Sequence, residues 1–164
     1  MPMNRLWVLR HAKSDWSRAL PDFDRDLNER GVRNAEALRD WLRGQDYLPQ
    51  RIVTSPALRA ARTAEAARAA CPRARFLTDM RIYHGDADTM LRVVCEVEDA
   101  IESLLIAGHN PGITYFVNAL SGSPVIDVLP TCGLVRFSVK CPWRELEFGA
   151  ARLDLLRTPK GGVQ

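Results

Sequence analysis

Hydrophobic positions along this chain follow two patterns that alternate with each other. Short apolar runs bounded by polar residues are typical of buried strands, and here they cover residues 6–9, 51–54, 74–78, 104–107, 133–139 and 145–156. Longer segments repeat their apolar residues with a helical period, as Val32, Ala35 and Leu38 do within residues 29–43. The other segments predicted to be helical are residues 56–70, 89–102 and 111–121.

Polar and special residues mark the ends of these predicted helices. Serine and asparagine cap helix starts because their side chains accept a hydrogen bond from a free backbone N–H, and proline fits the first helical turn. Glycine ends helices because it adopts left-handed backbone angles easily. We therefore expect caps, first-turn prolines and a terminator at Asn28, Ser55, Pro56, Asn110, Pro111 and Gly122.

The order of these elements predicts the fold class. Strands that alternate with helices form parallel βαβ units, and the last two strands, which have no helix between them, favour an antiparallel edge. We predict an α/β protein made of a single three-layer domain, with a mostly parallel sheet and helices on both faces. The domain is expected to span residues 1–158, followed by a flexible, glycine-rich tail at 159–164.

Composition narrows the classes of function. The chain has 164 residues, of which 46% are hydrophobic and 26% charged, as in ordinary globular proteins. Its formal charge is +3 and its arginines are scattered rather than clustered, which argues against a nucleic-acid partner. Neither a secretory signal nor an apolar run long enough for a membrane helix is found, so we predict a cytoplasmic protein with no membrane partner.

Nitrogen-rich side chains follow three of the predicted strands. Arg10 and His11 end the first, Arg59 lies one turn into the helix after the second, and His109 follows the third. Ligands of open α/β sheets bind outside the carboxyl ends of the strands. Guanidinium groups and helix N-termini there favour an anion, and a phosphoryl group would use the most donors.

The histidines suggest how such a site could react. A neutral imidazole is a nucleophile and could accept the phosphoryl group covalently. The strand ends carry no H-x-E or D-x-D arrangement typical of metal ligands, so we expect neither a metal nor another cofactor.

Three motifs carry a family resemblance. The stretches "LRHAKSDW", "TSPALRAARTAE" and "LIAGHNPG" resemble, in matching order, the histidine phosphatase superfamily, and more narrowly its SixA-type phosphohistidine phosphatase branch. The resemblance implies the phosphoglycerate-mutase-like fold and a phosphatase, a hydrolase. It also implies that His11 becomes phosphorylated and that Arg10, Arg59 and His109 hold the phosphoryl oxygens.

The chain departs from the family pattern in the first motif. Ala12 replaces the usual glycine. Alanine is small enough to keep the turn, but left-handed backbone angles there would cost about 1–2 kcal/mol, so Ala12 is the first residue to check for strain. Ser17 occupies the position of an asparagine that contacts phosphate in mutases. Lys13 and Ser14, at the pocket lip, are further candidates for substrate contacts. Asn110, in the third motif, is another candidate if it does more than cap a helix.

The residue that would protonate the leaving group lies outside these three motifs. Larger relatives place a glutamate where this chain has His84, with Asp86 and Asp88 nearby. We take His84 as a candidate general acid, with Asp86 as the alternative. Thr131 or Cys132, in the loop before the last strands, are candidates for approaching the phosphate.

The missing glutamate favours one substrate class. A leaving alkoxide needs a strong, well-placed acid, whereas a leaving imidazole is protonated near neutral pH. The leading hypothesis is therefore a metal-independent phosphatase acting on phosphohistidine of a protein. The alternatives are a phosphatase for small phosphorylated molecules and a phosphate-binding module without turnover.

Overall fold

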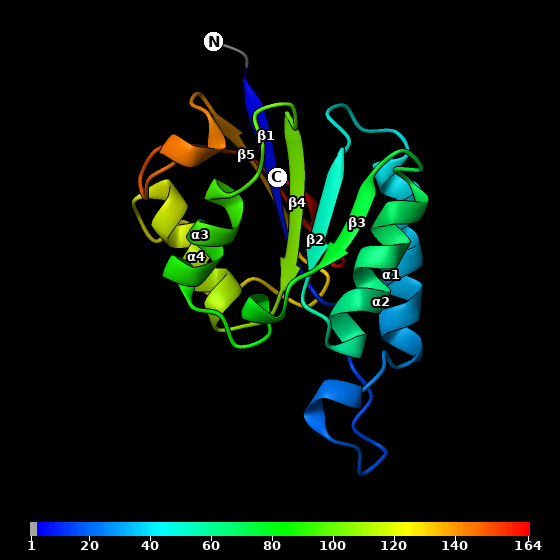
Figure 1. Cartoon of the computed structure of the whole chain (residues 1–164). Coiled ribbons are helices and arrows are strands. Elements are labelled where there is room, and N and C mark those ends of the chain that lie inside the picture. Colours follow the sequence, from blue (N-terminus) through cyan, green and yellow to red (C-terminus); the bar gives the residue numbers. More distant parts are fainter. Residues whose placement is uncertain (1–2) are drawn as a thin grey trace.

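A twisted seven-stranded sheet runs through the protein and carries helices on both faces (Figure 1). The computed structural model describes residues 3–164. Helices α1 and α2 cover one face, and α3 and α4 cover the other. In chain order the elements are β1 (Asn4–Arg10), η1 (Asp22–Asp24), α1 (Glu29–Leu42), β2 (Arg51–Thr54), α2 (Leu58–Ala69), β3 (Arg75–Thr78), η2 (Met80–Ile82), α3 (Ala87–Cys95), β4 (Ser103–Gly108), α4 (Gly112–Ser121), β5 (Leu134–Val139), η3 (Trp143–Glu145), β6 (Ala151–Thr158) and β7 (Gly162–Val163).

The strand order is β3-β2-β4-β1-β5-β6-β7. The neighbours β3, β2, β4 and β1 run parallel, because a helix connects each strand to the next parallel one. Strands β5, β6 and β7 add an antiparallel edge. The α/β fold class and the helices on both faces are therefore confirmed.

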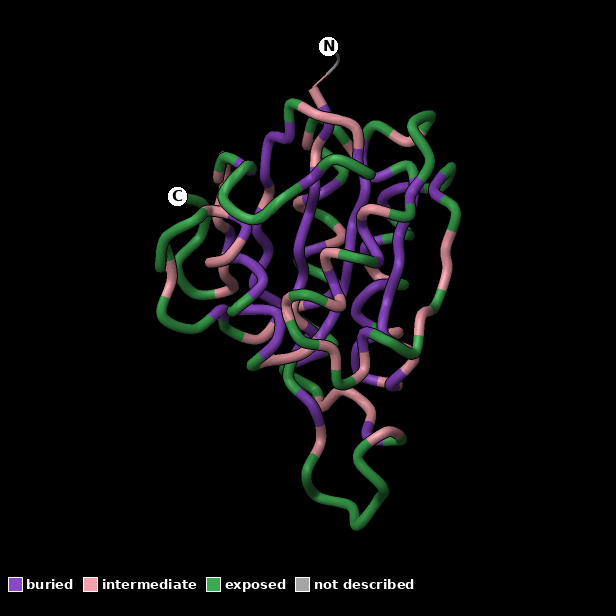
Figure 2. Tube along the Cα trace, turned by 60° about the vertical axis from the view of Figure 1, so that its left-hand side comes forward, coloured by how far each residue is buried: buried purple, intermediate pink, exposed green. Residues whose placement is uncertain are grey.

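Alternate residues of β1 belong to two different cores. Leu6 and Val8 pack in the cluster beneath α3 and α4, whereas Trp7 and Leu9 pack in the cluster beneath α1 and α2. A strand covered on both faces needs apolar side chains on both, which is why it reads as a continuous apolar run. The buried parts of the tube in Figure 2 follow these central strands.

Two helix boundaries were predicted correctly and two were not. Asn28 caps α1 by accepting a hydrogen bond from Gly31 N (2.8 Å), and Gly122 ends α4 with a φ of 75°. Ser55 does not cap α2, because its hydroxyl accepts from Ala57 N in a turn that precedes the helix. Asn110 does not cap α4, since its amide donates to Leu129 O.

Two predicted ranges were also wrong. The helix predicted at 89–102 is α3, which begins at Ala87 and ends at Cys95. It begins at Ala87 because the side chain of Asp86 accepts a hydrogen bond from Thr89 N. The strand predicted at 145–156 begins at Ala151, because Gly149 makes a turn with a φ of 83°. In the segment predicted as a tail, β7 pairs with β6, and the domain boundary at residue 158 stays a prediction. None of the helices within residues 3–164 has both the length and the apolarity to cross a membrane.

Gly31 lets α1 approach the loop that follows β1. A Cβ atom at this position would lie 2.1 Å from Lys13 O, a distance that no side chain tolerates. Lys13 O also accepts a hydrogen bond from Asn28 N (3.0 Å). The start of α1 therefore fixes the backbone two residues beyond His11.

We predict that Gly31→Ala lowers the free energy of unfolding by about 2 kcal/mol, because the new methyl group overpacks against backbone. Gly44→Ala is the matched control, since the nearest atom to its Cβ would be Trp41 O at 3.8 Å. Urea denaturation of both variants measures the difference. Equal stabilities would show that the loop moves aside without cost.

Candidate active site

The carboxyl ends of β1, β2 and β4 meet at one edge of the sheet. Their parallel register pairs Arg10 with Gly108 and Thr54 with Ala107. The residues that follow continue the ladder, with His11 N donating to Gly108 O (3.2 Å). A cavity of about 720 Å³ opens there. It is lined by Arg10, His11, Lys13, Ser14, Trp16, Asp22, Arg25, Arg59, Tyr83, His84, Gly85, Asp86, His109, Asn110, Pro111, Gly112, Tyr115 and Thr131.

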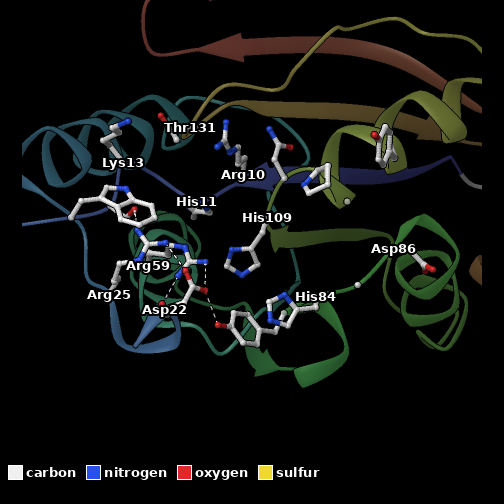
Figure 3. A pocket seen from close by; sticks show the side chains of 18 residues that line it. Arg10, His11, Lys13, Asp22, Arg25, Arg59, His84, Asp86, His109 and Thr131 are labelled. Atoms are coloured by element: carbon white, nitrogen blue, oxygen red, sulfur yellow. Dashed lines mark hydrogen bonds and ion pairs between the residues drawn. The ribbon is translucent and has the colours of Figure 1, made fainter. Parts of the chain in front are cut away.

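The four residues that the strand ends predicted lie together in this cavity. Figure 3 shows Arg10, His11, Arg59 and His109 grouped around its centre. The rings of His11 and His109 have their centroids 5.2 Å apart. Two guanidinium groups and two imidazoles therefore face a common space.

His11 is held in one tautomer. Its Nδ1 lies 2.7 Å from Ala12 O, and a carbonyl oxygen can only accept, so Nδ1 carries the proton. The lone pair of Nε2 is then free. Burial, aided by the charges of Arg59 and Arg10, lowers the pKa of His11 to about 4. The imidazole is consequently neutral, and nucleophilic, at physiological pH.

His109 lies in a similar environment on the neighbouring strand end. Its Nε2 shares a 2.8 Å hydrogen bond with Ser55 Oγ, which ties β4 to β2. Burial, followed by the nearby His11 and Arg59, lowers the pKa of His109 to about 3. Its Nδ1 is buried and has no partner among the described residues.

The two arginines are fixed by acceptors outside the cavity centre. Arg10 donates from Nη1 to Leu129 O (2.9 Å). Arg59, in the first turn of α2, donates to Asp22 O (2.7 Å) and to Asp22 Oδ2 (3.0 Å). Guanidinium groups that are oriented in advance suit a phosphoryl group, whose oxygens accept such paired donors.

Asp22 is a functional candidate that the sequence did not predict. Its carboxylate accepts from Arg25 Nη2 (2.6 Å), from the Tyr83 hydroxyl (2.7 Å) and from Arg59. The hydrogen bonds from Arg25 and Tyr83 hold the pKa of Asp22 well below its usual range. Asp22 begins the short η1, in a polar segment without a repeating pattern, and only the folded chain brings it to Arg59, so no spacing signal could have identified it.

Ala12, where the family has glycine, shows no backbone strain. Within residues 3–164 the non-glycine residues with positive φ are Tyr47 and Cys132, so Ala12 has ordinary backbone angles. Ala12 is fully buried, and its N–H donates to Thr63 Oγ1 (2.9 Å). The same hydroxyl donates to Arg59 O (2.7 Å), which links the loop after His11 to α2.

Three of the remaining candidates for substrate contacts line the cavity, and Ser17 does not. Lys13 lines the cavity and is exposed, and Asn110 lines it while its amide donates to Leu129 O. Ser17 lies outside the cavity lining, where its backbone N–H donates to Asp15 Oδ1 (2.8 Å). Ser14 also lines the cavity but is buried, and its hydroxyl accepts from Arg25 (2.6 Å).

Two acid candidates also line the cavity. His84 is exposed and stacks on Tyr83, with ring centroids 4.0 Å apart. Asp86 lies to one side in Figure 3, and its carboxylate accepts from Thr89 N (2.8 Å). That hydrogen bond lowers the pKa of Asp86, so this carboxylate is ionised. Asp88 lies outside the lining.

The loop before β5 contributes backbone as well as a side chain. Thr131 lines the cavity, whereas the side chain of Cys132 is buried elsewhere, with its thiol 3.6 Å from Asn34 O. Cys132 N instead donates to Arg10 O (3.1 Å) and His11 O (2.9 Å). Among residues 3–164, no group of three or more His, Cys, Asp or Glu side chains is arranged to hold a metal ion.

Known proteins resemble this chain in sequence. A family model described as histidine phosphatase superfamily (branch 1) matches residues 6–83. An uncharacterised protein of Mycobacterium leprae is 31% identical over 93% of this chain and 100% of its own length.

Solved structures extend the likeness to the whole fold. A candidate phosphohistidine phosphatase SixA from Agrobacterium tumefaciens has a TM-score of 0.83 and 27% identity, covering 97% of this chain and 99% of its own. A second such candidate, from Nakamurella multipartitia, has a TM-score of 0.85 and 26% identity, covering 98% and 99%.

The low pKa of His11 predicts that acid destabilises the fold. An unfolded histidine titrates near 6.5, whereas His11 in the folded chain titrates near 4. Between these values the unfolded chain binds a proton that the folded chain does not, so stability falls as the pH drops below about 6.5. For this group alone, the loss from pH 7 to pH 5 is about 2 kcal/mol.

Urea denaturation of wild type and His11→Asn at pH 7 and pH 5 measures this effect. Other titrating groups contribute to both proteins, so only the difference between their losses reports on His11. We expect the variant to lose about 2 kcal/mol less than wild type. Equal losses would mean that His11 is already protonated in the folded protein at pH 5.

Proposed function

This chain belongs to the histidine phosphatase superfamily, and its likeness to phosphatases of known structure supports a phosphatase activity; we propose that His11 accepts the phosphoryl group covalently. The observation that carries the proposal is the tautomer of His11. Its Nδ1–H is engaged by Ala12 O, which leaves the Nε2 lone pair free in a cavity that contains two arginines.

In the first step, Nε2 of His11 attacks phosphorus. A P–N bond to His11 forms while the bond from phosphorus to the leaving group breaks. Arg10 and Arg59 neutralise the charge on the phosphoryl oxygens, and His109 lies close enough to His11 to contact the same oxygens. The transition state of such a transfer is loose and oxygen-rich, so positioning and positive charge are the main contributions.

In the second step, water attacks the phosphorus atom that is bound to His11. The P–N bond breaks, phosphate leaves with the oxygen of water, and the water proton passes to phosphate or solvent. Because Nδ1 keeps its proton throughout, the imidazole leaves phosphorus as a neutral group. No base is needed to activate His11, since its low pKa keeps it neutral.

We propose phosphohistidine on a protein, such as a phosphotransfer domain, as the substrate. Both carboxylates that line the cavity are ionised: Asp22 is engaged by Arg25 and Tyr83, and Asp86 caps α3. Neither is available as an acid for an alkoxide. A protonated imidazole leaves without such help, and the two SixA-like structures carry names that point the same way.

One observation favours a different substrate class. His84 is exposed, lines the cavity and stacks on Tyr83, so it could protonate the oxygen of a small phosphate ester. A binding module without turnover is less well supported, because binding alone does not require the free Nε2 of His11.

Trapping the intermediate tests the role of His11. Brief incubation of wild type with a labelled phosphoryl donor and rapid quenching should give an acid-labile, alkali-stable protein adduct. His11→Ala should give none, and its turnover should fall at least about a thousandfold, because no other group replaces a covalent nucleophile. His84→Ala is the matched control and should keep the adduct. An adduct on another residue, or full activity in His11→Ala, would refute the proposal.

Substrate preference tests the role of the acid. We expect kcat/KM for a phosphohistidine protein to exceed that for glycerol phosphate by at least about a hundredfold, and His84→Gln to change the former by less than about threefold. If wild type hydrolyses both equally well, and His84→Gln loses glycerol phosphate turnover by about a hundredfold, the enzyme acts on small esters through His84.

A further inference from the structure

Two aromatic side chains stand exposed at the edge of the candidate active site. Trp16 is 73% exposed and Tyr115 is 63% exposed, and both line the cavity. They come from different elements, since Trp16 lies in the loop between β1 and η1 and Tyr115 lies in α4. In Figure 1 this loop hangs below α1 and α2, whereas α4 lies on the other side of β4. Neither core cluster includes these side chains.

The indole of Trp16 is held in place although it is exposed. The guanidinium carbon of Arg25 lies 3.6 Å from the centre of its ring. Arg25 is itself buried, with 6% exposure. It donates to Ser14 Oγ (2.6 Å) and Asp22 Oδ1 (2.6 Å). A bridge between Ser14 and Leu27 closes the base of the loop. A fixed aromatic ring loses little entropy on binding, which is typical of residues that dominate protein interfaces.

Tyr115 is anchored through the backbone of α4. Its N–H donates to Pro111 O (3.2 Å), and Pro111 also lines the cavity. Gly112 allows this end of α4 to pack on the loop that carries His84, since a Cβ there would lie 2.2 Å from Gly85 O. Trp16 and Tyr115 are thus both presented from rigid supports.

We infer that Trp16 and Tyr115 form a docking rim that binds the apolar surface around the phosphorylated histidine of a protein substrate. The inference rests on the proposed function and adds to it the part of the enzyme that recognises the protein. The phosphoryl group would contact the arginines and histidines inside the cavity. The surface of the substrate protein around its phosphohistidine would contact the exposed residues that line the cavity, Trp16 and Tyr115. Tryptophan and tyrosine are enriched at such contacts because they bury large areas with few rotatable bonds.

The test compares protein-borne and free phosphohistidine as substrates. Wild type, Trp16→Ala, Trp16→Phe and Tyr115→Ala are assayed on a histidine-phosphorylated phosphotransfer domain and on free phosphohistidine. Phe148→Ala is the control, because Phe148 is an exposed aromatic residue that does not line the cavity. Free phosphohistidine fits inside the cavity, so turnover of this substrate also checks that each variant is folded.

We expect Trp16→Ala to lower kcat/KM about tenfold or more on the phosphoprotein, mainly through KM, and less than about twofold on free phosphohistidine. Tyr115→Ala should also lower kcat/KM on the phosphoprotein, whereas Trp16→Phe should keep most of the wild-type value. Phe148→Ala should leave kcat/KM unchanged for both substrates. Equal losses on both substrates, or none on the phosphoprotein, would overturn the inference while leaving the proposed function intact. A wild type that hydrolyses neither form would refute the proposed function itself. If Trp16→Ala and Tyr115→Ala lower kcat/KM for small aromatic phosphates but not for the phosphoprotein, the rim binds a small molecule and the inference is overturned.

Discussion

The parallel pairing of β1 with β4 is the constraint on which the site depends. Its register places Arg10 opposite Gly108, so the residues that follow, His11 and His109, leave the sheet side by side. Both imidazoles are consequently buried, and burial is the largest cause of their low pKa values. Burial is unfavourable for a charged imidazole but suits a nucleophile that must be neutral. Burial of the two imidazoles therefore both disfavours their protonation and keeps His11 neutral for attack on phosphorus.

Each strand end is held by hydrogen bonds to its neighbours as well as by the sheet. Cys132 N contacts the carbonyl groups of Arg10 and His11, and Thr63 connects Ala12 to Arg59. These bonds join β1, α2 and the loop before β5 into one unit. His11 and Arg59 are therefore held in fixed positions relative to each other. This arrangement depends on several elements and not on one.

The loop between β1 and α1 connects the inside of the cavity with its mouth. Asp22 holds Arg59 inside, and it also holds Arg25, which supports the exposed Trp16 outside. A carboxylate that stays ionised serves both contacts, because hydrogen bonds from Arg25 and Tyr83 lower its pKa. The proposed phosphoryl site and Trp16 of the proposed docking rim therefore share one anchor.

The sequence by itself determined the fold class, the central strands and the position of Arg10, His11, Arg59 and His109 at strand ends, because these follow from local periodicity and from the geometry of parallel sheets. It could not determine that Asn110 bonds elsewhere than to the helix start, or that Ala12 is unstrained, since the partners of both residues are distant in the chain. Only the tertiary structure brought Arg59 and Tyr83 to Asp22, fixed the tautomer of His11 and left Trp16 exposed beside the cavity. Such contacts join segments with no repeating pattern, and they exist only once the sheet has brought those segments together.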